Sequence, residues 1–357
     1  MANRSTKLAR MSPISTAVIG GGIAGVTASR LLAVLGDVSQ LGRIALFDRG
    51  QRLGGRMSSR PINEQFTWRY GYQGLGVYAD PERTPRGAQR LEGKDRAEAL
   101  ALLGRATERG TVAQSPLSSS DLLSLPDAVE VHTKCNIVDL RRTAEHRWQL
   151  TFEQQDAGQT HAMFDRVVVA DHTAATSLLR PEASHIVDRI RGVEYRPMFA
   201  YMARLSGEDS CATTASNDEW RLTFSMLRHA KNSPYIWGFT SSDTTARLLT
   251  EHPMTDASGR VVPQSKDYRA AIASKLDRVI EASGGHVVES FCHRWGRAIP
   301  INPVEGESFI YDAALQVGCC GDMFRVDDCA PFESAVRSAE AMAKFITITP
   351  PKPVAKL

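Results

Sequence analysis

Glycines at a fixed spacing near the amino end could bind phosphate through the backbone. Gly20, Gly22 and Gly25 fit the pattern G-x-G-x-x-G, and Ile23 and Ala24 stand between the last two. In such a turn the first glycine permits the tight bend, the second lets the backbone approach a pyrophosphate, and the third lets a helix pack closely on a strand. The helix would add free N–H groups and a positive dipole end. The spacing therefore predicts a dinucleotide-binding turn.

The residues around these glycines predict the elements that must position them. Residues 15–19 are a short apolar run typical of a buried strand, and residues 43–47 predict a second strand. Between them, residues 26–35 predict a helix that ends at Gly36. Asp48 follows the second strand, where a carboxylate can accept hydrogen bonds from both ribose hydroxyls and would repel a 2′-phosphate. The alternative, a plain strand–helix turn, is disfavoured because all these features occur in order.

A second glycine motif, the pair Gly54-Gly55, follows soon after Asp48 and stands between arginines in the pattern R-x-G-G-R. Two successive glycines allow another close approach of the backbone, and arginine forks suit phosphate oxygens. A solvated turn is the alternative for this segment taken alone. The residues that we expect at this second cofactor contact are Arg49, Arg52, Gly54, Gly55, Arg56 and Met57.

With these two motifs the chain resembles the flavin amine oxidase superfamily and, within it, the renalase-like branch. The resemblance rests on residues 17–32 and 47–60. Two further segments support it: residues 164–170 resemble the strand that returns from an inserted β-meander, and residues 317–322 resemble the closing FAD motif. The resemblance implies an α/β fold, with a Rossmann-like FAD-binding domain of the GR2 type, split in sequence, and a second, antiparallel-sheet substrate domain.

The closing motif implies further cofactor contacts. In the superfamily, the aspartate of the pair matched by Gly321 and Asp322 lies against the ribityl and phosphate end of the flavin. A helix predicted over 332–346 would direct its first N–H groups, near Phe332 and Glu333, at the flavin ring. An ordinary terminal helix is a compatible reading. The resemblance also implies FAD contacts at two residues elsewhere in the chain, Gln73 and Ile137.

The segments that match the family's substrate side depart from its pattern. In residues 66–74, Arg69 replaces an acid, whereas Gln73 is kept. In residues 293–300, Trp295 matches a tryptophan brought to the flavin, but Gly296-Arg297 replaces Arg-Tyr. The residues that we expect at the catalytic pocket are Trp295, Tyr72 and Gln73. His172 and His229 could titrate near neutral pH, although a structural role is the commoner meaning of a lone histidine.

Apolar patterns outside the motifs predict the remaining organisation. Strands over 137–140 and 148–152 would form the meander, and a polar segment contains a helical run over 95–107. The substrate domain would contain a helix over 268–282 and strands over 198–205, 221–227, 235–240 and 287–295. We expect the FAD-binding domain to comprise 14–75, 127–180 and 300–347, the substrate domain 76–126 and 181–299, and flexible tails 1–13 and 348–357.

Composition excludes several classes of protein. The 357 residues suggest about two domains, and the net charge of +3 gives no argument for a nucleic-acid or membrane partner. The six cysteines form no C-x-x-C pair, so we expect neither a zinc or other metal site nor a disulfide scaffold. The basic residues among the first ten predict a disordered tail or, alternatively, a short organelle-targeting sequence. We expect a cytoplasmic location.

The resemblance implies a reaction. FAD would be bound non-covalently, because no cysteine clearly matches the covalent link of the larger monoamine oxidases. The substrate would be a small amine or dihydro-heterocycle, such as the dihydronicotinamide (NAD(P)H-type) isomers oxidised by renalase-like enzymes, with O2 as electron acceptor. Arg69, Arg294 and Arg297 would suit a phosphate-bearing substrate. Two alternatives stay open: a specialised-metabolism oxidase, desaturase or cyclase on the same fold, and a non-catalytic flavin- or nucleotide-binding protein.

Overall fold

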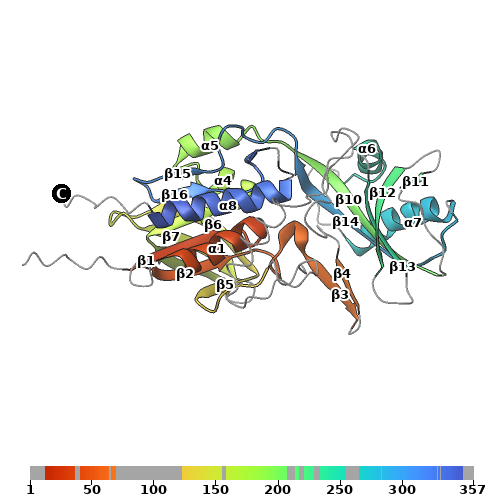
Figure 1. The fold of residues 1–357 in the computed structure, drawn as a ribbon, viewed down its shortest axis with the longest axis horizontal. Coiled ribbons are helices and arrows are strands. Elements are labelled where there is room, and N and C mark those ends of the chain that lie inside the picture. Colours follow the sequence, from red (N-terminus) through yellow and green to blue (C-terminus); the bar gives the residue numbers. More distant parts are fainter. Residues whose placement is uncertain are drawn as a thin grey trace, which may run out of the picture. The chain divides into compact units, whose positions relative to one another are not determined.

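The computed structural model describes most of the chain in two compact units (Figure 1). Unit 1 contains the described residues of Met1–Gly55, Gln73–Val193 and Pro303–Leu357, and unit 2 those of Arg56–Tyr72 and Glu194–Asn302. The described residues are 13–36, 41–63, 66–69, 123–154, 158–206, 214–216, 221–228, 234–240, 242–253, 265–282, 284–327, 329 and 331–348. The predicted helical run over 95–107, Tyr72, Gln73 and His229 lie outside these residues.

Unit 1 is built on a six-stranded sheet in the order β15-β16-β9-β1-β2-β5. All neighbours pair in parallel except β15, which is antiparallel to β16. The central strands are almost continuous apolar runs, as expected of parallel strands covered on both faces. The strands are β1 (Ile14–Ile19), β2 (Leu41–Phe47), β5 (Val129–His132), β9 (Arg166–Val169), β15 (Ile310–Asp312) and β16 (Val317–Cys319).

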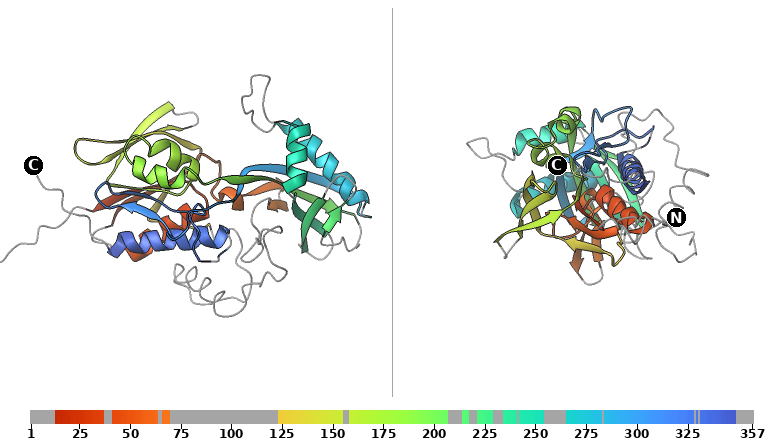
Figure 2. Two further views of the ribbon diagram at one scale, coloured as in Figure 1. Left: turned by 90° about the horizontal axis from the view of Figure 1, so that it is seen from above. Right: turned by 90° about the vertical axis from the view of Figure 1, so that its left-hand side faces the viewer.

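Helices from the two ends of the chain lie side by side on one face of this sheet. α1 (Ile23–Leu35) packs against α8 (Pro331–Ile348), and Figure 2 shows both on the face opposite α4 (His172–Leu178) and α5 (Ser184–Ile190). α1 begins earlier than predicted, because the glycine motif itself forms its first turn. The helix ends at Gly36 as predicted, but Gly36 has a φ of −66° and is not left-handed.

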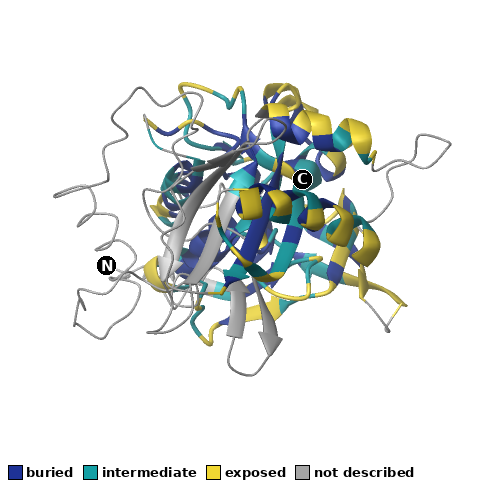
Figure 3. Cartoon of the chain, turned by 90° about the vertical axis from the view of Figure 1, so that its right-hand side faces the viewer, coloured by how far each residue is buried: buried dark blue, intermediate teal, exposed yellow. Residues whose placement is uncertain are grey.

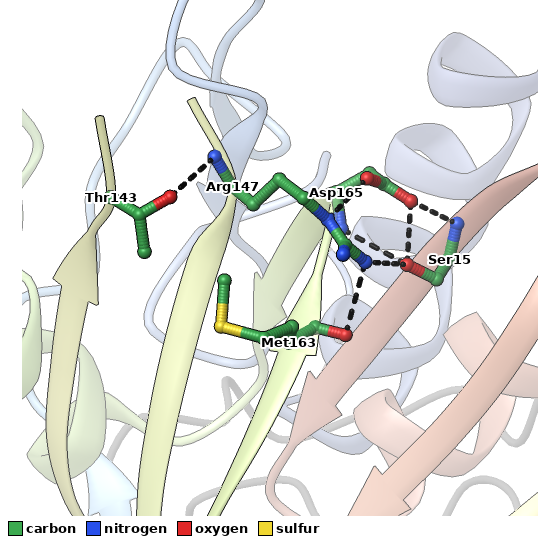
Figure 4. A network of polar contacts seen from close by, with 5 residues as sticks. All are labelled: Ser15, Thr143, Arg147, Met163 and Asp165. Carbon is green, nitrogen blue, oxygen red and sulfur yellow. Dashed lines mark hydrogen bonds and ion pairs between the residues drawn. The ribbon is translucent and has the colours of Figure 1, made fainter. Parts of the chain in front are cut away.

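A three-stranded antiparallel meander, β6 (Cys135–Arg142), β7 (Trp148–Gln154) and β8 (Gly158–Phe164), is attached to unit 1 as predicted. A polar network fastens it to β1 (Figure 4). The N–H and the hydroxyl of Ser15 donate to Oδ2 of Asp165 at 2.8 and 2.6 Å, and Arg147 Nε donates to Oδ1 at 2.9 Å. Asp165, which directly follows β8, thus connects β8 to the start of β1 and to Arg147, the residue before β7.

Replacing Asp165 with asparagine is expected to reduce stability at neutral pH by about 1–2 kcal/mol, because charge-assisted hydrogen bonds are lost. Burial raises the pKa of Asp165, but the hydrogen bonds from Ser15 and the charge of Arg147 together bring this pKa below its ordinary value. The stabilisation is therefore present above the ordinary carboxyl pKa and is lost as the pH falls through the folded-state pKa. Urea unfolding between pH 7 and pH 3 should show a smaller pH dependence in Asp165→Asn; an unchanged dependence would contradict the assignment.

Unit 2 contains a five-stranded antiparallel sheet in the order β11-β12-β13-β10-β14. α6 (Ser242–Glu251) and α7 (Lys266–Ala282) alternate buried and exposed residues, as the colouring in Figure 3 shows, and their buried sides contribute to the unit's apolar core. A separate hairpin, β3 (Ser59–Asn63) and β4 (Phe66–Arg69), also belongs to unit 2. The sheet strands are β10 (Tyr195–Leu205), β11 (Thr214–Ser216), β12 (Arg221–Arg228), β13 (Pro234–Thr240) and β14 (Val287–Pro300).

A half-buried carboxylate, that of Asp277, fixes α7 to the sheet of unit 2. The hydroxyl of Tyr201 on β10 donates to Oδ1 of Asp277 at 2.6 Å, and the hydroxyl of Ser290 on β14 donates to Oδ2 at 3.0 Å. Burial, reinforced by the charge of Asp277, raises the pKa of Tyr201 far above its usual value. The phenol is therefore a permanent donor to the helix.

Tyr201→Phe is expected to destabilise the protein by about 2 kcal/mol, because Asp277 then loses a buried hydrogen-bond donor. The matched control is Tyr268→Phe on α7. The Tyr268 hydroxyl is buried but finds no hydrogen-bond partner among the described residues, so its removal should cost nothing or should stabilise. Denaturant unfolding of both variants measures the difference, and equal effects would contradict the role assigned to Asp277.

The observed units differ from the predicted domain boundaries at several places. Residues 123–126, predicted in the substrate domain, lie in unit 1, and residues 300–302, predicted in the FAD-binding domain, lie in unit 2. The described residues of 56–69 belong to unit 2, because Arg56 and the β3–β4 hairpin make their contacts there. Residues 181–193 belong to unit 1, where Arg189 of α5 pairs with Glu307. None of the described helices has both the length and the apolar character that a membrane crossing would need.

Candidate dinucleotide-binding site

The first glycine motif forms the turn from β1 into α1. Gly20 has a φ of +105°, which favours glycine, and its N–H donates to the carbonyl of Phe47 at 2.9 Å. A Cβ on Gly25 would lie 1.8 Å from the carbonyl oxygen of Gly20. A Cβ on Gly21 would lie 2.6 Å from a methyl of Leu53. Close packing within the protein therefore explains the glycine at all three positions.

Gly22 is different, because nothing in the described protein requires a glycine there. Its φ of −70° and ψ of 179° suit any residue, and a Cβ would meet no atom within 4 Å. Gly22 is the N-cap of α1, yet the helix has no side-chain cap and no acidic residue in its first turn. A helix start with an open, uncapped backbone fits a phosphate-bearing ligand, since the ligand itself can take the place of the cap. These residues therefore fit the dinucleotide that the spacing predicts.

The second glycine motif lies directly against the first. The N–H of Gly54 donates to the carbonyl of Gly21 at 2.7 Å, and Gly22 and Gly54 form a parallel bridge. Gly54 and Gly55 have φ values of +122° and +50°, so both occupy conformations that favour glycine. The structure thus brings together the two segments that the sequence analysis assigned to one ligand.

Asp48 stands at the end of β2 and is held by both neighbouring turns. Its Oδ2 accepts the N–H of Gly21 and its Oδ1 accepts the N–H of Gly50, each at 2.5 Å. The pKa of Asp48 lies above its ordinary value, chiefly because the carboxyl group is partly buried. The hydrogen bonds from the two N–H groups lower this pKa, and the negative charge of Asp171 raises it. Each carboxylate oxygen keeps a further lone pair, so Asp48 can still accept a hydroxyl group of a ligand.

Asp171 is a site residue that the sequence analysis missed. It follows β9, and its Cβ would lie 3.1 Å from a Cβ on Gly20. Its Oδ1 accepts the N–H of Ala174 at 2.8 Å and so caps α4. Two carboxylates, Asp48 and Asp171, therefore flank the first glycine from the strands on either side of β1. An acid directly after a buried strand was the available signal, because the same signal identified Asp48.

The turn between β5 and β6 runs beside Asp48. The Asp48 N–H donates to the carbonyl of His132, and its own carbonyl accepts from Cys135, both at 2.9 Å. The N–H of Lys134 donates to the carbonyl of Gly50 at 2.8 Å. Ile137, a predicted cofactor contact, is the third residue of β6 and is half-buried.

The arginines of the second motif have different positions. Arg49 and Arg52 are exposed on the turn that follows Asp48. Arg56 lies in unit 2, where its Nη1 donates to the carbonyl of Ala298 at 2.8 Å and its guanidinium lies 5.9 Å from the centroid of the Tyr195 ring. The predicted phosphate contact of Arg56 stays a prediction, and its neighbour Met57 is buried.

The closing motif lies beside the first glycine motif, although about 300 residues of chain separate them. The Cys320 N–H continues the sheet by donating to the carbonyl of Val169 at 3.1 Å. Gly321 then turns with a φ of +136°, and a Cβ there would lie 4.0 Å from the Cβ of Ala24 on α1. Asp322 is buried directly after this turn.

The first turn of α8 holds the other two predicted flavin contacts, Phe332 and Glu333. Phe332 is buried and Glu333 is partly buried. Ser338, further along α8, is a residue that the sequence analysis missed: its hydroxyl accepts the N–H of Gly321 at 2.8 Å. No local pattern distinguishes Ser338 from any other small residue of a packed helix.

The predicted substrate-side residues are only partly described. The Trp295 ring on β14 contacts the His293 ring edge-on, with centroids 4.4 Å apart. The guanidinium of Arg297 lies 5.8 Å from the centroid of the Tyr195 ring. His172 is buried and bonds through Nε2 to the carbonyl of Ile190 at 2.9 Å, so it has the structural role that joins α4 to α5.

The comparisons with known proteins concern the fold. Residues 18–83 match the family of NAD(P)-binding Rossmann-like domains. None of the curated proteins matches the chain. The cyclohexylamine oxidase from Brevibacterium oxydans IH-35A is similar over 94% of this chain and 99% of its own, at 12% identity and a TM-score of 0.57.

A second solved structure, CabE, an aromatic hydroxylase from angucycline biosynthesis, shares 15% identity over 94% of this chain, with a TM-score of 0.50. The chain spans 62% of the length of CabE, 63% of that of AlpK and 58% of that of the flavin-dependent halogenase CmlS. Its fold is thus a Rossmann-like domain with a parallel sheet plus separate antiparallel sheets, similar to that of the cyclohexylamine oxidase.

Proposed function

We propose that the chain is an oxidoreductase that binds FAD non-covalently and oxidises a small amine or dihydro-heterocycle. The observation that carries the proposal is the open backbone at Gly22, which forms a bridge with Gly54 of the second glycine motif. A flavin dinucleotide needs a site for its pyrophosphate, a site for the adenosine ribose and a site for its flavin half. Segments from both ends of the chain converge here and can supply all three.

Each part of the site has a separate role in this proposal. The N–H groups at the start of α1 bind the pyrophosphate, and Asp48 accepts the ribose hydroxyls. Asp322 and the first turn of α8 hold the flavin half, as the family resemblance implies. When bound, FAD would supply the redox chemistry, accepting two electrons as a hydride at N5 and passing them to O2, which becomes H2O2.

The cysteines of unit 1 support non-covalent binding. Cys319 and Cys320, in the closing motif, are fully buried. Burial raises the pKa of Cys320 to about 12 and that of Cys319 further still. The thiolate is the reactive form, and at neutral pH these thiols are almost entirely protonated. A low content of thiolate disfavours a thioether between either cysteine and the flavin.

The substrate class rests on two lines of support. The similarity to the cyclohexylamine oxidase extends over nearly the full length of both chains, which favours an amine. The renalase-like sequence features favour a dihydronicotinamide of the NAD(P)H type. A specialised-metabolism flavoenzyme on the same fold is a second candidate, favoured by Gly296-Arg297 in the tryptophan segment and by the similarity to CabE.

The cofactor is tested first, by the visible spectrum of the purified protein after incubation with FAD and removal of excess. Flavin absorbance that co-purifies and is released by heat is the expected result. A folded, colourless protein that takes up no FAD would refute the proposal. Amines and dihydronicotinamides are then added under air, with flavin bleaching and peroxide as readouts. Flavin that dithionite reduces but air does not reoxidise would indicate a binding protein and not an oxidase.

A further inference from the structure

The closing turn depends on a hydrogen bond from outside its own segment. Cys320 is the last residue of this segment whose N–H bonds to the sheet. The next N–H, that of Gly321, is buried and donates to the hydroxyl of Ser338 at 2.8 Å. Ser338 is itself fully buried on α8. A buried N–H without an acceptor is costly, so the Ser338 hydroxyl determines where the turn can lie.

The same hydroxyl also determines the position of α8 relative to this turn. Ser338 lies about two helical turns after Pro331, where α8 begins. A helix is rigid over this distance, so its first residues, Phe332 and Glu333, are fixed in relation to Ser338. One hydrogen bond thus couples two elements that the proposed function assigns to the flavin half of FAD: Asp322 and the amino end of α8.

We propose that Ser338 is a positioning residue for the flavin half of the site, and this inference rests on the proposed binding of FAD. The hydrogen bond of Ser338 is to Gly321 and not to Gly22 or Asp48. In the proposed function, Gly22 and Asp48 bind the pyrophosphate and the adenosine ribose of FAD. Loss of the Ser338 hydroxyl therefore weakens the binding of FAD and leaves unchanged the binding of a ligand that occupies only the adenosine half of the site.

The test is Ser338→Ala, with the affinities of FAD and ADP measured by titration of the apoprotein. FAD binding is expected to weaken about tenfold, equivalent to about 1.4 kcal/mol, whereas ADP binding stays the same. Hydrogen exchange at the Gly321 amide should become faster. The matched control is Ser29→Ala on α1, a fully buried serine whose hydroxyl finds no hydrogen-bond partner among the described residues; it should change none of these values.

Several results would overturn the inference. Equal weakening of FAD and ADP would indicate a general structural role, and unchanged FAD affinity would show that the turn does not depend on Ser338. If the alanine variant does not fold, Ser338→Cys, of similar size but with a much weaker acceptor, replaces it with the same expected split. Failure of the wild-type protein to bind FAD would refute the proposed function itself, whereas normal wild-type binding with an unaffected variant refutes this inference alone.

Discussion

Gly25→Ala is expected to destabilise the protein by about 4 kcal/mol or more, a large part of the stability of a typical domain. The added methyl would lie 1.8 Å from the carbonyl oxygen of Gly20, which is backbone and cannot rotate away. Either α1 moves off the turn and loses its packing on β1 and α8, or the turn itself opens. Urea unfolding of wild type and variant measures the loss.

Helix propensity alone would change the free energy of unfolding of Gly25→Ala in the opposite direction. Alanine is the better helix former by about 1 kcal/mol, so a purely local effect would stabilise. Wild-type or increased stability would therefore show that the contact between α1 and the Gly20 turn is not as close as described. Gly22→Ala is the matched control, since its methyl meets no described atom within 4 Å and its backbone angles suit alanine.

Gly22→Asp is expected to abolish dinucleotide binding while leaving the protein as stable as the wild type or more so. The residue has the extended backbone of an N-cap and no side-chain cap, so an aspartate there can bond to the free N–H groups of α1. Relative to glycine, such a cap contributes about 0.3 kcal/mol. The same carboxylate occupies the N–H groups and places a negative charge where the phosphates are proposed to bind.

Two measurements check the Gly22 prediction: thermal unfolding of the apoprotein, and titration with FAD and ADP. Gly22→Asn is the control, because it caps the helix without charge and should weaken binding less than aspartate does. Unchanged FAD affinity in Gly22→Asp would place the ligand elsewhere and would remove the main support for the proposed function. A large loss of stability would instead show that the open side of Gly22 is filled by protein.

The sequence predicted those parts of the fold that depend on local patterns. The strands β1, β2, β7 and β9 and the helix α8 follow from apolar runs and from the positions of glycine and proline, and the structure confirms them. The order of the glycine motifs predicted that both contact one ligand. Gly54 bonds to Gly21, so the two motifs are adjacent, and the shared ligand stays a prediction.

Long-range partners could not be predicted in this way. The hydrogen bond from Arg56 to the carbonyl of Ala298, 242 residues further along the chain, follows from no pattern around Arg56. Ser338 and Gly321 meet only because α8 returns to the sheet, and no spacing within either segment encodes this contact. Local sequence patterns therefore do not predict side chains whose role depends on tertiary contacts.

The pairing of α1 with α8 has a consequence during synthesis of the protein. The apolar side of α1 is synthesised before its partner helix, which is translated roughly 300 residues later; this takes about 15–60 s at ordinary elongation rates. During this interval we expect the nascent chain to expose the apolar side of α1 and a sheet that still lacks β15 and β16. Chaperones that bind nascent chains are thus expected to bind this one. The yield of folded protein should be lower in expression hosts that lack such chaperones.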